Sequence, residues 1–479
     1  MPVITIQHVD GSSPVQFYVV TPGKNLGPFV VPSPVGYSVG NRELMSELRW
    51  YLERFLSYPY PPETDRAKQL LDGLEKWGRE IGTALFDNRE VGRILDLATD
   101  DGYTDLELRI SSDDPRVLQW PWEAIRTSDG GVLSRTCQIK RQLNEVRSPP
   151  AISDKLPSDC VNILLVTARP MKADVGYRSI SRLLVERIRE EKLPAKITVL
   201  RPPTLAQLRR HLRDRPDHYH ILHFDGHGSY GGPPAHDTQA AFDFQSAQGQ
   251  LVFEDENGDP DAHDASILSE LLKEHHVPVV VLNACQSAMV DERAKDAFAS
   301  VAAALQWSGV RSVVAMAYSL YVSGAQQFLP EFYQRLFESG QVSEAARAGR
   351  QKMLERQERI CSRGKFKLED WLVPVVYEQE SFDFSFANTT TVEETEINSV
   401  VPTQARDNEN PYGFFGRDNA VLEMERAMHR PPAGILVHGL GGIGKTTLTQ
   451  GFIRWLASTD GLAMAVSGFR FRKSEVRSL

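Results

Sequence analysis

Two residues that together could perform nucleophilic chemistry each follow an apolar segment near the middle of this chain. His227 follows residues 218–224 within the sequence DGHG, and Cys285 follows residues 277–284 within NACQS. A thiol is a strong nucleophile only as the thiolate, and a nearby imidazole can take its proton and later return it to a leaving group. The two residue types therefore predict a catalytic pair, with Cys285 as nucleophile and His227 as base.

Two glycines beside the histidine add to this hypothesis. Gly226 and Gly228 predict a sharp turn of the backbone after the apolar segment. The N–H of Gly228, together with that of Cys285, would then hold the oxyanion of a tetrahedral intermediate.

Other interpretations of the same residues remain open. A free cysteine at a strand end is more often a small buried apolar side chain. Four histidines (His218, His220, His223 and His227) raise the question of a metal site. No carboxylate or cysteine completes a familiar ligand set with them, so no metal is predicted, and His223 is expected to pack behind the loop.

The elements that must position the pair alternate between strand and helix. Apolar segments bounded by turn residues predict buried strands, and segments of helical period lie between them. The predicted strands are 161–170, 196–200, 218–224, 277–284 and 310–318, and the predicted helices are 177–191, 204–214, 264–276 and 297–309. This alternation predicts a doubly wound, mostly parallel α/β sheet. Reactive groups gather at the carboxyl ends of such strands, so His227 and Cys285 are expected to meet although they are 58 residues apart.

The rest of the chain divides by composition. Residues 1–150 predict a mixed α/β region with an aromatic segment, LQWPWEAI, at 118–125. Residues 151–380 form the sheet domain, 381–411 form a polar linker, and 412–479 begin a second α/β unit. The linker is also a weak candidate for self-cleavage.

Bulk properties exclude several classes of protein. The net charge of −9 over 479 residues argues against nucleic-acid binding. The four cysteines show no disulfide or CxxC spacing, which fits a reducing compartment. Because neither a signal peptide nor an apolar run of about 20 residues is visible, we expect a cytoplasmic protein without a membrane segment.

Several motifs in the same order resemble the CHAT family of caspase-like cysteine proteases (clan CD), which are related to separases and metacaspases. The matching segments, within about residues 100–380, are LQWPWEAI, HFDGHG, LVFEDENG, VVLNACQSA, GVRSVVAMAYSL and DWLVPVVY. The resemblance implies a caspase-like fold, with residues 1–150 as a possible degenerate caspase-like half. It also implies that His227 is the base, Cys285 the nucleophile and Gly228 an oxyanion donor. The motif NACQS differs from the QAC motif of true caspases.

The resemblance does not determine which substrate residue precedes the cut bond. Metacaspases, which cut after basic residues, carry an aspartate two positions before the cysteine, and here that position is the neutral Asn283. Arg169 follows the first strand and either lines the substrate pocket, as an arginine does in caspases, or lies on the surface. Asp225, Glu254, Asp255 and Glu256 form either an acidic cleft or a solvated loop.

A glycine-rich loop, GLGGIGKT, spans residues 439–446 and fits the P-loop pattern GxxxxGK[ST]. An apolar segment at 434–438 predicts the strand before it, and a helix is predicted after it. Phosphates would lie against Gly439 and Gly444, Lys445 would reach the β- and γ-phosphates, and Thr446 would ligate Mg²⁺.

The preceding YGFFGRD at 412–418 resembles the lead-in of STAND-type NTPases, which implies ATP and Mg²⁺ as cofactors of a full NTPase domain. Only 33 residues follow Thr446 and no second acidic strand is visible, so this chain is expected to carry an incomplete NTPase domain that binds nucleotide weakly or not at all.

Together the motifs predict a cysteine endopeptidase that needs no cofactor for its chemistry. The resemblance implies regulation by a STAND-type sensor or repeat region, a role in bacterial defence or programmed cell death, and a protein substrate such as a pore-former or toxin. Two alternatives remain: a CHAT scaffold without catalysis, and a nucleotide switch whose N-terminal part only binds partners.

Overall fold

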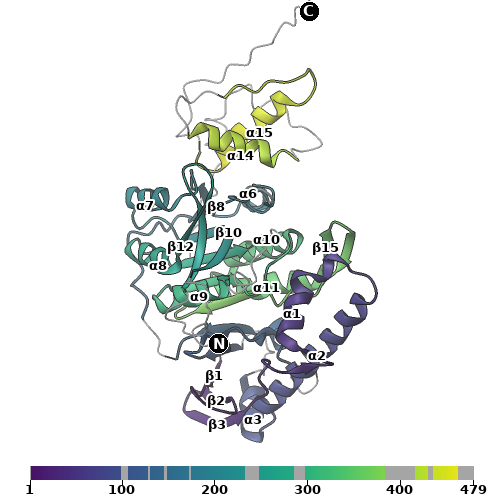
Figure 1. Ribbon diagram of the computed structural model, residues 1–479. Helices are drawn as coiled ribbons and strands as arrows, with labels where there is room; N and C mark the ends of the chain where they lie inside the picture. The colour runs from purple at the N-terminus through teal and green to yellow at the C-terminus, as the bar shows by residue number, and fades with distance from the viewer. Residues whose placement is uncertain are drawn as a thin grey trace, which may run out of the picture.

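A single sheet of thirteen strands organises the computed structural model (Figure 1). The structure describes residues 2–98, 106–127, 130–144, 148–171, 174–231, 248–284, 297–382, 384, 416–429 and 435–461. The sheet runs in the order β12-β11-β10-β13-β14-β17-β7-β6-β1-β2-β3, and β8 and β9 extend it from β10.

The strands of this sheet are β1 (Val3–His8), β2 (Gln16–Thr21), β3 (Lys24–Val30), β6 (Glu107–Ser111), β7 (Gln138–Gln142), β8 (Val161–Thr167), β9 (Ala195–Val199), β10 (Ile221–Gly231), β11 (Gln248–Glu254), β12 (Pro260–Asp264), β13 (Val279–Ala284), β14 (Ser312–Met316) and β17 (Pro374–Glu378). Two small hairpins stand apart from it, β4 (Ser38–Val39) with β5 (Arg42–Glu43), and β15 (Glu358–Cys361) with β16 (Gly364–Lys367).

The helices are α1 (Leu44–Glu53), α2 (Glu63–Phe86), α3 (Arg89–Ala98), α4 (Pro115–Leu118), α5 (Leu133–Thr136), α6 (Ser181–Glu190), α7 (Leu205–Asp214), α8 (Ala265–Glu274), α9 (Ala297–Trp307), α10 (Val322–Ser339), α11 (Val342–Glu355), α14 (Asp418–Met428) and α15 (Lys445–Ser458). Short 3₁₀ turns lie at Phe55–Ser57 and Trp122–Ala124.

The central strands are parallel and buried on both faces. β8, β10, β13 and β14 pair in parallel, and every residue of β8 is buried. Neighbouring residues of a strand point to opposite faces of the sheet. In β10, His223 accordingly stacks on Tyr333 of α10, whereas the next residue, Phe224, contacts Phe253 of β11. The predicted fold class, a doubly wound and mostly parallel α/β sheet, is confirmed.

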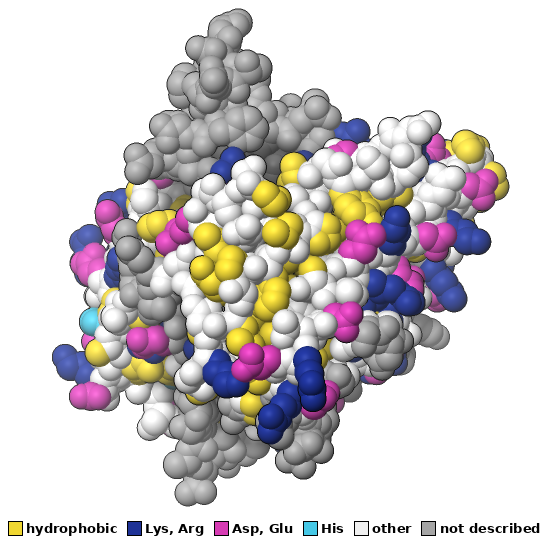
Figure 2. Space-filling view, turned by 90° about the horizontal axis from the view of Figure 1, so that it is seen from below, with side chains coloured by type: hydrophobic (Ala, Val, Ile, Leu, Met, Phe, Trp, Pro, Cys, Tyr) yellow, Lys and Arg dark blue, Asp and Glu magenta, His cyan; other side chains and the backbone are white. Residues whose placement is uncertain are grey.

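The N-terminal region continues the same sheet. β7 pairs in parallel with β17 through Tyr377 and Arg141, and β6 and β1 follow in parallel. The predicted aromatic segment is buried here, with Trp120 and Trp122 stacked against each other. The guanidinium of Arg141 binds both carboxylate oxygens of Glu123, at 2.7 and 2.8 Å. On the face of the molecule seen from below, hydrophobic side chains gather across the middle, with charged groups mostly around them (Figure 2).

Two predictions of local structure are wrong. The backbone does not turn at Gly226 and Gly228, because β10 continues to Gly231 by pairing with β11 where β8 ends. The strand predicted at 434–438 is also absent over the described part, 435–439, where Leu436 is 85% exposed. A buried strand needs a neighbour that satisfies its backbone groups, and none of the described strands lies beside it.

Candidate functional site

His227 lies where strand β10 exchanges one partner for another. Residues Ile221–Asp225 pair with β8, and His227 opens the antiparallel pairing with β11, opposite Val252. Its side chain is only 2% exposed, and its Nε2 lies 2.8 Å from Oδ2 of Asp174. A carboxylate in this place accepts a hydrogen bond from Nε2–H, so the ring nitrogen Nδ1 carries the lone pair that can accept a proton.

Asp174 is the residue of the site that sequence reasoning missed. It lies in the loop that follows β8, and its side chain is 6% exposed. Loops at the carboxyl ends of parallel strands commonly carry functional residues. That rule was the only available signal, because no spacing links Asp174 to His227, 53 residues later.

The neighbouring strand β13 leads directly to Cys285. It pairs in parallel with β10, with Asp225 opposite Asn283 and Gly226 opposite Ala284. Cys285 itself lies outside the described residues. The described pairing therefore ends one residue before His227 on one strand and one residue before Cys285 on the other.

The three predicted pocket residues form a buried network with one another. Arg169 Nη2 lies 2.6 Å from Oδ2 of Asp225, and Asn283 Nδ2 donates to the other oxygen of Asp225 at 3.0 Å. Arg169 and Asp225 are about 1% and 0% exposed. The opposite charges lie against each other beneath the strand ends, so this network presents neither a free cation nor a free anion to a substrate.

Two of the other acidic residues considered for a cleft, Glu254 and Asp255, lie in different environments. Glu254 is buried, and burial raises the pKa of its carboxyl, although the Arg169 amide and the Arg426 guanidinium oppose the shift. Asp255 is partly exposed and accepts hydrogen bonds from the amides of Asp259 and Asn257, which hold its pKa below the ordinary value. Asp255 thus stabilises the turn between β11 and β12.

The two glycines beside His227 lie in different structural surroundings. A Cβ on Gly226 would lie 2.9 Å from the ring of Phe224, so close packing explains this residue. Gly228 lies opposite Leu251 in the pairing of β10 with β11, and its role as oxyanion donor stays a prediction.

Two of the other histidines of the region have structural roles. His220 accepts a hydrogen bond from the Asn162 amide at 3.0 Å, and the ring of His223 lies 2.8 Å from the hydroxyl of Tyr333. Burial lowers the pKa of each imidazole to about 4. Within the described ranges, no group of three His, Cys, Asp or Glu side chains is arranged to hold a metal ion.

The glycine-rich loop precedes helix α15, as the motif requires. Gly439 and Gly444 have φ angles of +150° and +86°, where a side chain would be strained. Lys445 Nζ donates to the carbonyls of Gly439 and Leu440, at 2.9 and 2.8 Å. The lysine therefore lies across the loop, and Thr446 follows it in the first turn of α15.

The sequence matches one known family model, described as the CHAT domain, over residues 75–402. The chain belongs to the CHAT family. Since CHAT is a caspase-like family, the predicted caspase-like fold class is confirmed. The match includes the predicted 381–411 linker up to residue 402 and does not reach the glycine-rich loop, so the STAND-type NTPase stays a prediction.

Comparisons with individual proteins give less information than the family match. No curated protein matches the chain. Two crystal structures of the Saccharomyces cerevisiae separase–securin complex, at 2.6 and 3.0 Å, each align with 11% identity and a TM-score of 0.40. Each alignment covers 80% of this CHAT chain and 30% of the separase–securin chain.

Two further observations concern the helices and the thiols of the described residues. Across the part of the chain that the structure describes, no helix is long and apolar enough to cross a membrane. Burial raises the pKa of Cys137 to about 12 and that of Cys160 to about 11, whereas Cys361 is partly exposed.

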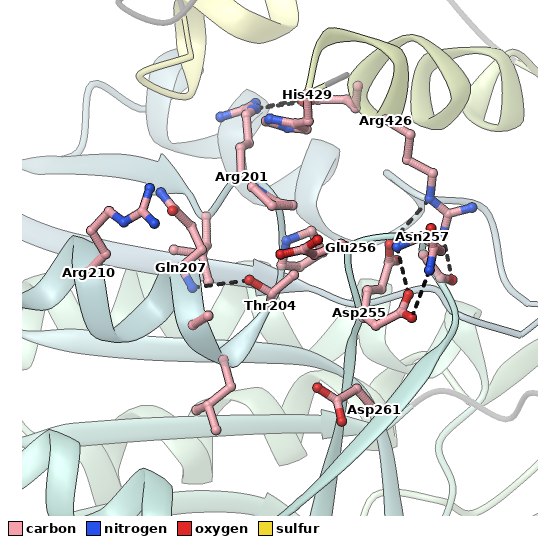
Figure 3. A pocket seen from close by; sticks show the side chains of 18 of the residues that line it. Arg201, Thr204, Gln207, Arg210, Asp255, Glu256, Asn257, Asp261, Arg426 and His429 are labelled. Atoms are coloured by element: carbon pink, nitrogen blue, oxygen red, sulfur yellow. Dashed lines mark hydrogen bonds and ion pairs between the residues drawn. The ribbon is translucent and has the colours of Figure 1, made fainter. Parts of the chain in front are cut away.

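A large cavity among the described residues, about 1220 Å³, lies away from His227. It opens between the loop after β9, the β11–β12 turn and helix α14, and His227 does not line it (Figure 3).

Proposed function

We propose that this CHAT protein is a cysteine endopeptidase in which His227 is the base and Cys285 the nucleophile. One observation carries the proposal: the strand that contains His227 and the strand that leads into Cys285 are direct neighbours, in parallel register up to Gly226 and Ala284. Adjacent strands lie about 4.8 Å apart, which is the spacing a hydrogen-bonded pair of side chains needs.

The proposed reaction proceeds in two halves. His227 Nδ1 takes the thiol proton, and the thiolate attacks the peptide carbonyl to form a tetrahedral oxyanion, which the Gly228 and Cys285 amides stabilise. Collapse breaks the C–N bond, and the amine leaves with the proton from His227. Water, deprotonated by His227, then hydrolyses the thioester and restores the thiol.

Asp174 supports both halves as a positioning residue. Its carboxylate holds Nε2–H, so the ring keeps the tautomer in which Nδ1 can accept a proton. The carboxylate also stabilises the imidazolium that forms when the thiol proton is taken.

The substrate and its regulation are finer parts of the proposal. We infer a protein substrate, such as a pore-former or toxin, and control by a STAND-type NTPase with a sensor or repeat region, in bacterial defence or programmed cell death, inside the cytoplasm. The P-loop pattern supports the regulatory part, with Lys445 lying across the loop carbonyls. ATP and Mg²⁺ would then be cofactors of the regulator and not of the protease.

Cleavage of a complex peptide library tests the proposed activity. Mass spectrometry would identify new peptide termini with the wild-type protein, with Cys285→Ala, with His227→Ala and with Cys361→Ala, which removes a thiol distant from the site. We expect a shared residue before the cut bond, and cleavage that survives only in wild type and Cys361→Ala. Equal cleavage by Cys285→Ala would overturn the proposal, and absent cleavage by all four would favour the scaffold alternative.

A further inference from the structure

A pair of helices outside the CHAT match packs against the loop that carries Asp174. The helices are α14 and α15, and the match to the family ends at residue 402. We define the Asp174 loop as residues 169–171 and 174–180, described residues of the segment between β8 and α6. In Figure 1 the two helices lie beyond the ends of β8 and α6, where this loop is.

The helix pair is anchored to the sheet by a buried arginine. Arg201, which follows β9, binds the carboxylate of Glu425 on α14 at 2.8 Å. It also donates to the Thr459 carbonyl and hydroxyl, at 2.9 and 2.6 Å. Trp455 of α15 donates to the same Glu425 carboxylate at 3.0 Å. Because charge-assisted bonds of buried groups are strong, this anchor fixes α14 and α15 as one unit on the sheet.

From this anchor the helices hold the Asp174 loop near both of its ends. At the first end, Arg426 Nη2 donates to the Arg169 carbonyl at 3.1 Å and lies 3.0 Å from Glu254. The Glu254 carboxylate in turn accepts the Arg169 amide at 2.8 Å. In Figure 3, Arg426 extends from α14 toward the turn that carries Asn257.

At the second end, Asp418 of α14 accepts from the Arg178 guanidinium at 3.1 Å and from the Arg178 amide at 3.3 Å. The ring of Tyr177 meets Trp455 edge to face, with centroids 6.2 Å apart. The Arg178 guanidinium lies over the same Trp455 ring, 5.6 Å from its centroid. Asp174 lies between the two ends and makes its 2.8 Å contact with His227.

We infer that Asp418 and Arg426 are positioning residues for the catalytic histidine: α14 and α15 hold the Asp174 loop in the conformation that orients His227. This inference rests on the proposed function for its catalytic consequence. The placement of the loop and the orientation of the ring do not depend on catalysis, so they can be measured separately. A conformational change in the C-terminal region would therefore be transmitted to the protease site through this helix pair.

The experiment uses the 479-residue chain with Asp418→Asn, Arg426→Gln and the double variant. Glu423→Gln is the matched control, because it makes the same kind of change at an exposed position of α14. Asp418→Glu is the conservative rescue. Hydrogen exchange of peptides covering 169–180 reports the loop, and ¹⁵N NMR of the His227 imidazole, assigned with His227→Gln, reports the ring.

We expect about tenfold faster exchange in the loop for each single variant, more for the double variant, and wild-type exchange for Glu423→Gln. The His227 signal should shift in the double variant toward that of Asp174→Asn, and Asp418→Glu should restore it in part. In a cleavage assay kcat should fall with KM unchanged.

Unchanged exchange would overturn the inference whether or not the protein is a protease. Faster exchange with an unmoved His227 signal would also overturn it, because the helices would then hold the loop without orienting the ring. If instead exchange and the His227 signal change as expected and the wild-type protein cleaves nothing, the proposed function fails and the positioning inference stands.

Discussion

Replacing Asp174 with asparagine removes the charge beside His227 and keeps the size of the side chain. The two side chains are 6% and 2% exposed, and the contact is 2.8 Å. A hydrogen bond to a charged group contributes about 1.5–3 kcal/mol. Because about 1.36 kcal/mol corresponds to a factor of ten in rate, losing this bond as the imidazolium forms should slow the reaction about 10- to 160-fold.

The assay for this prediction is the second-order rate constant for modification of Cys285 by a peptidyl electrophile at fixed pH. Asp261→Asn is the matched control, since Asp261 lies 2.7 Å from Nε2 of His263 in a pair that is 43% and 25% exposed. An exposed pair contributes little, so this control should react within about twofold of wild type. If Asp174→Asn reacts as fast as wild type, Asp174 does not orient the base and the reasoning is wrong.

Three further predictions concern stability and ligand binding. Glu123→Gln leaves the buried Arg141 charge without its partner, so the free energy of unfolding should fall by about 3–5 kcal/mol in denaturant titration; a loss below about 1 kcal/mol would contradict this. His223 has a pKa of about 4 when folded and about 6.5 when unfolded, so the unfolded state binds more protons and stability is lost as the pH falls below about 6.5. At pH 5 this costs about 2 kcal/mol, and His223→Gln should lose that much less between pH 7 and pH 5 than wild type does. Calorimetry should detect no micromolar ATP binding to this chain, because the strand that would support the glycine-rich loop is not formed at 435–439; saturation at micromolar ATP would refute this.

The sequence predicted the sheet well because its signals are local. The apolar segments around Leu164, Leu222 and Val281 are long enough to mark strands buried on both faces, and the helices between them have clear amphipathic period. The parallel neighbours β10 and β13 then follow from the crossover rule. The segment at 434–438 is also apolar, yet residues 435–439 form no strand. Strand formation depends on pairing partners that a local sequence pattern does not encode.

The site was harder to predict than the sheet. His227 and Cys285 were found from their places after apolar segments, whereas Asp174 belongs to a loop without a motif and is revealed only by its contact with His227. For Arg169, Asp225 and Asn283 the residue types suggested a pocket. The described contacts join them in one buried network, because a charge away from water is stable only beside its opposite.

The most direct test of the central claim is selective labelling of Cys285 by a peptidyl electrophile, followed by mass spectrometry of all four cysteines. Burial and a raised pKa should keep Cys137 and Cys160 unreactive, and the partly exposed Cys361 provides the internal reference. We predict that Cys285 is labelled well before Cys361 in wild type and that His227→Ala abolishes this difference. Labelling of Cys285 that is no faster than that of Cys361, or that is unchanged in His227→Ala, would contradict the account of a histidine-activated thiol.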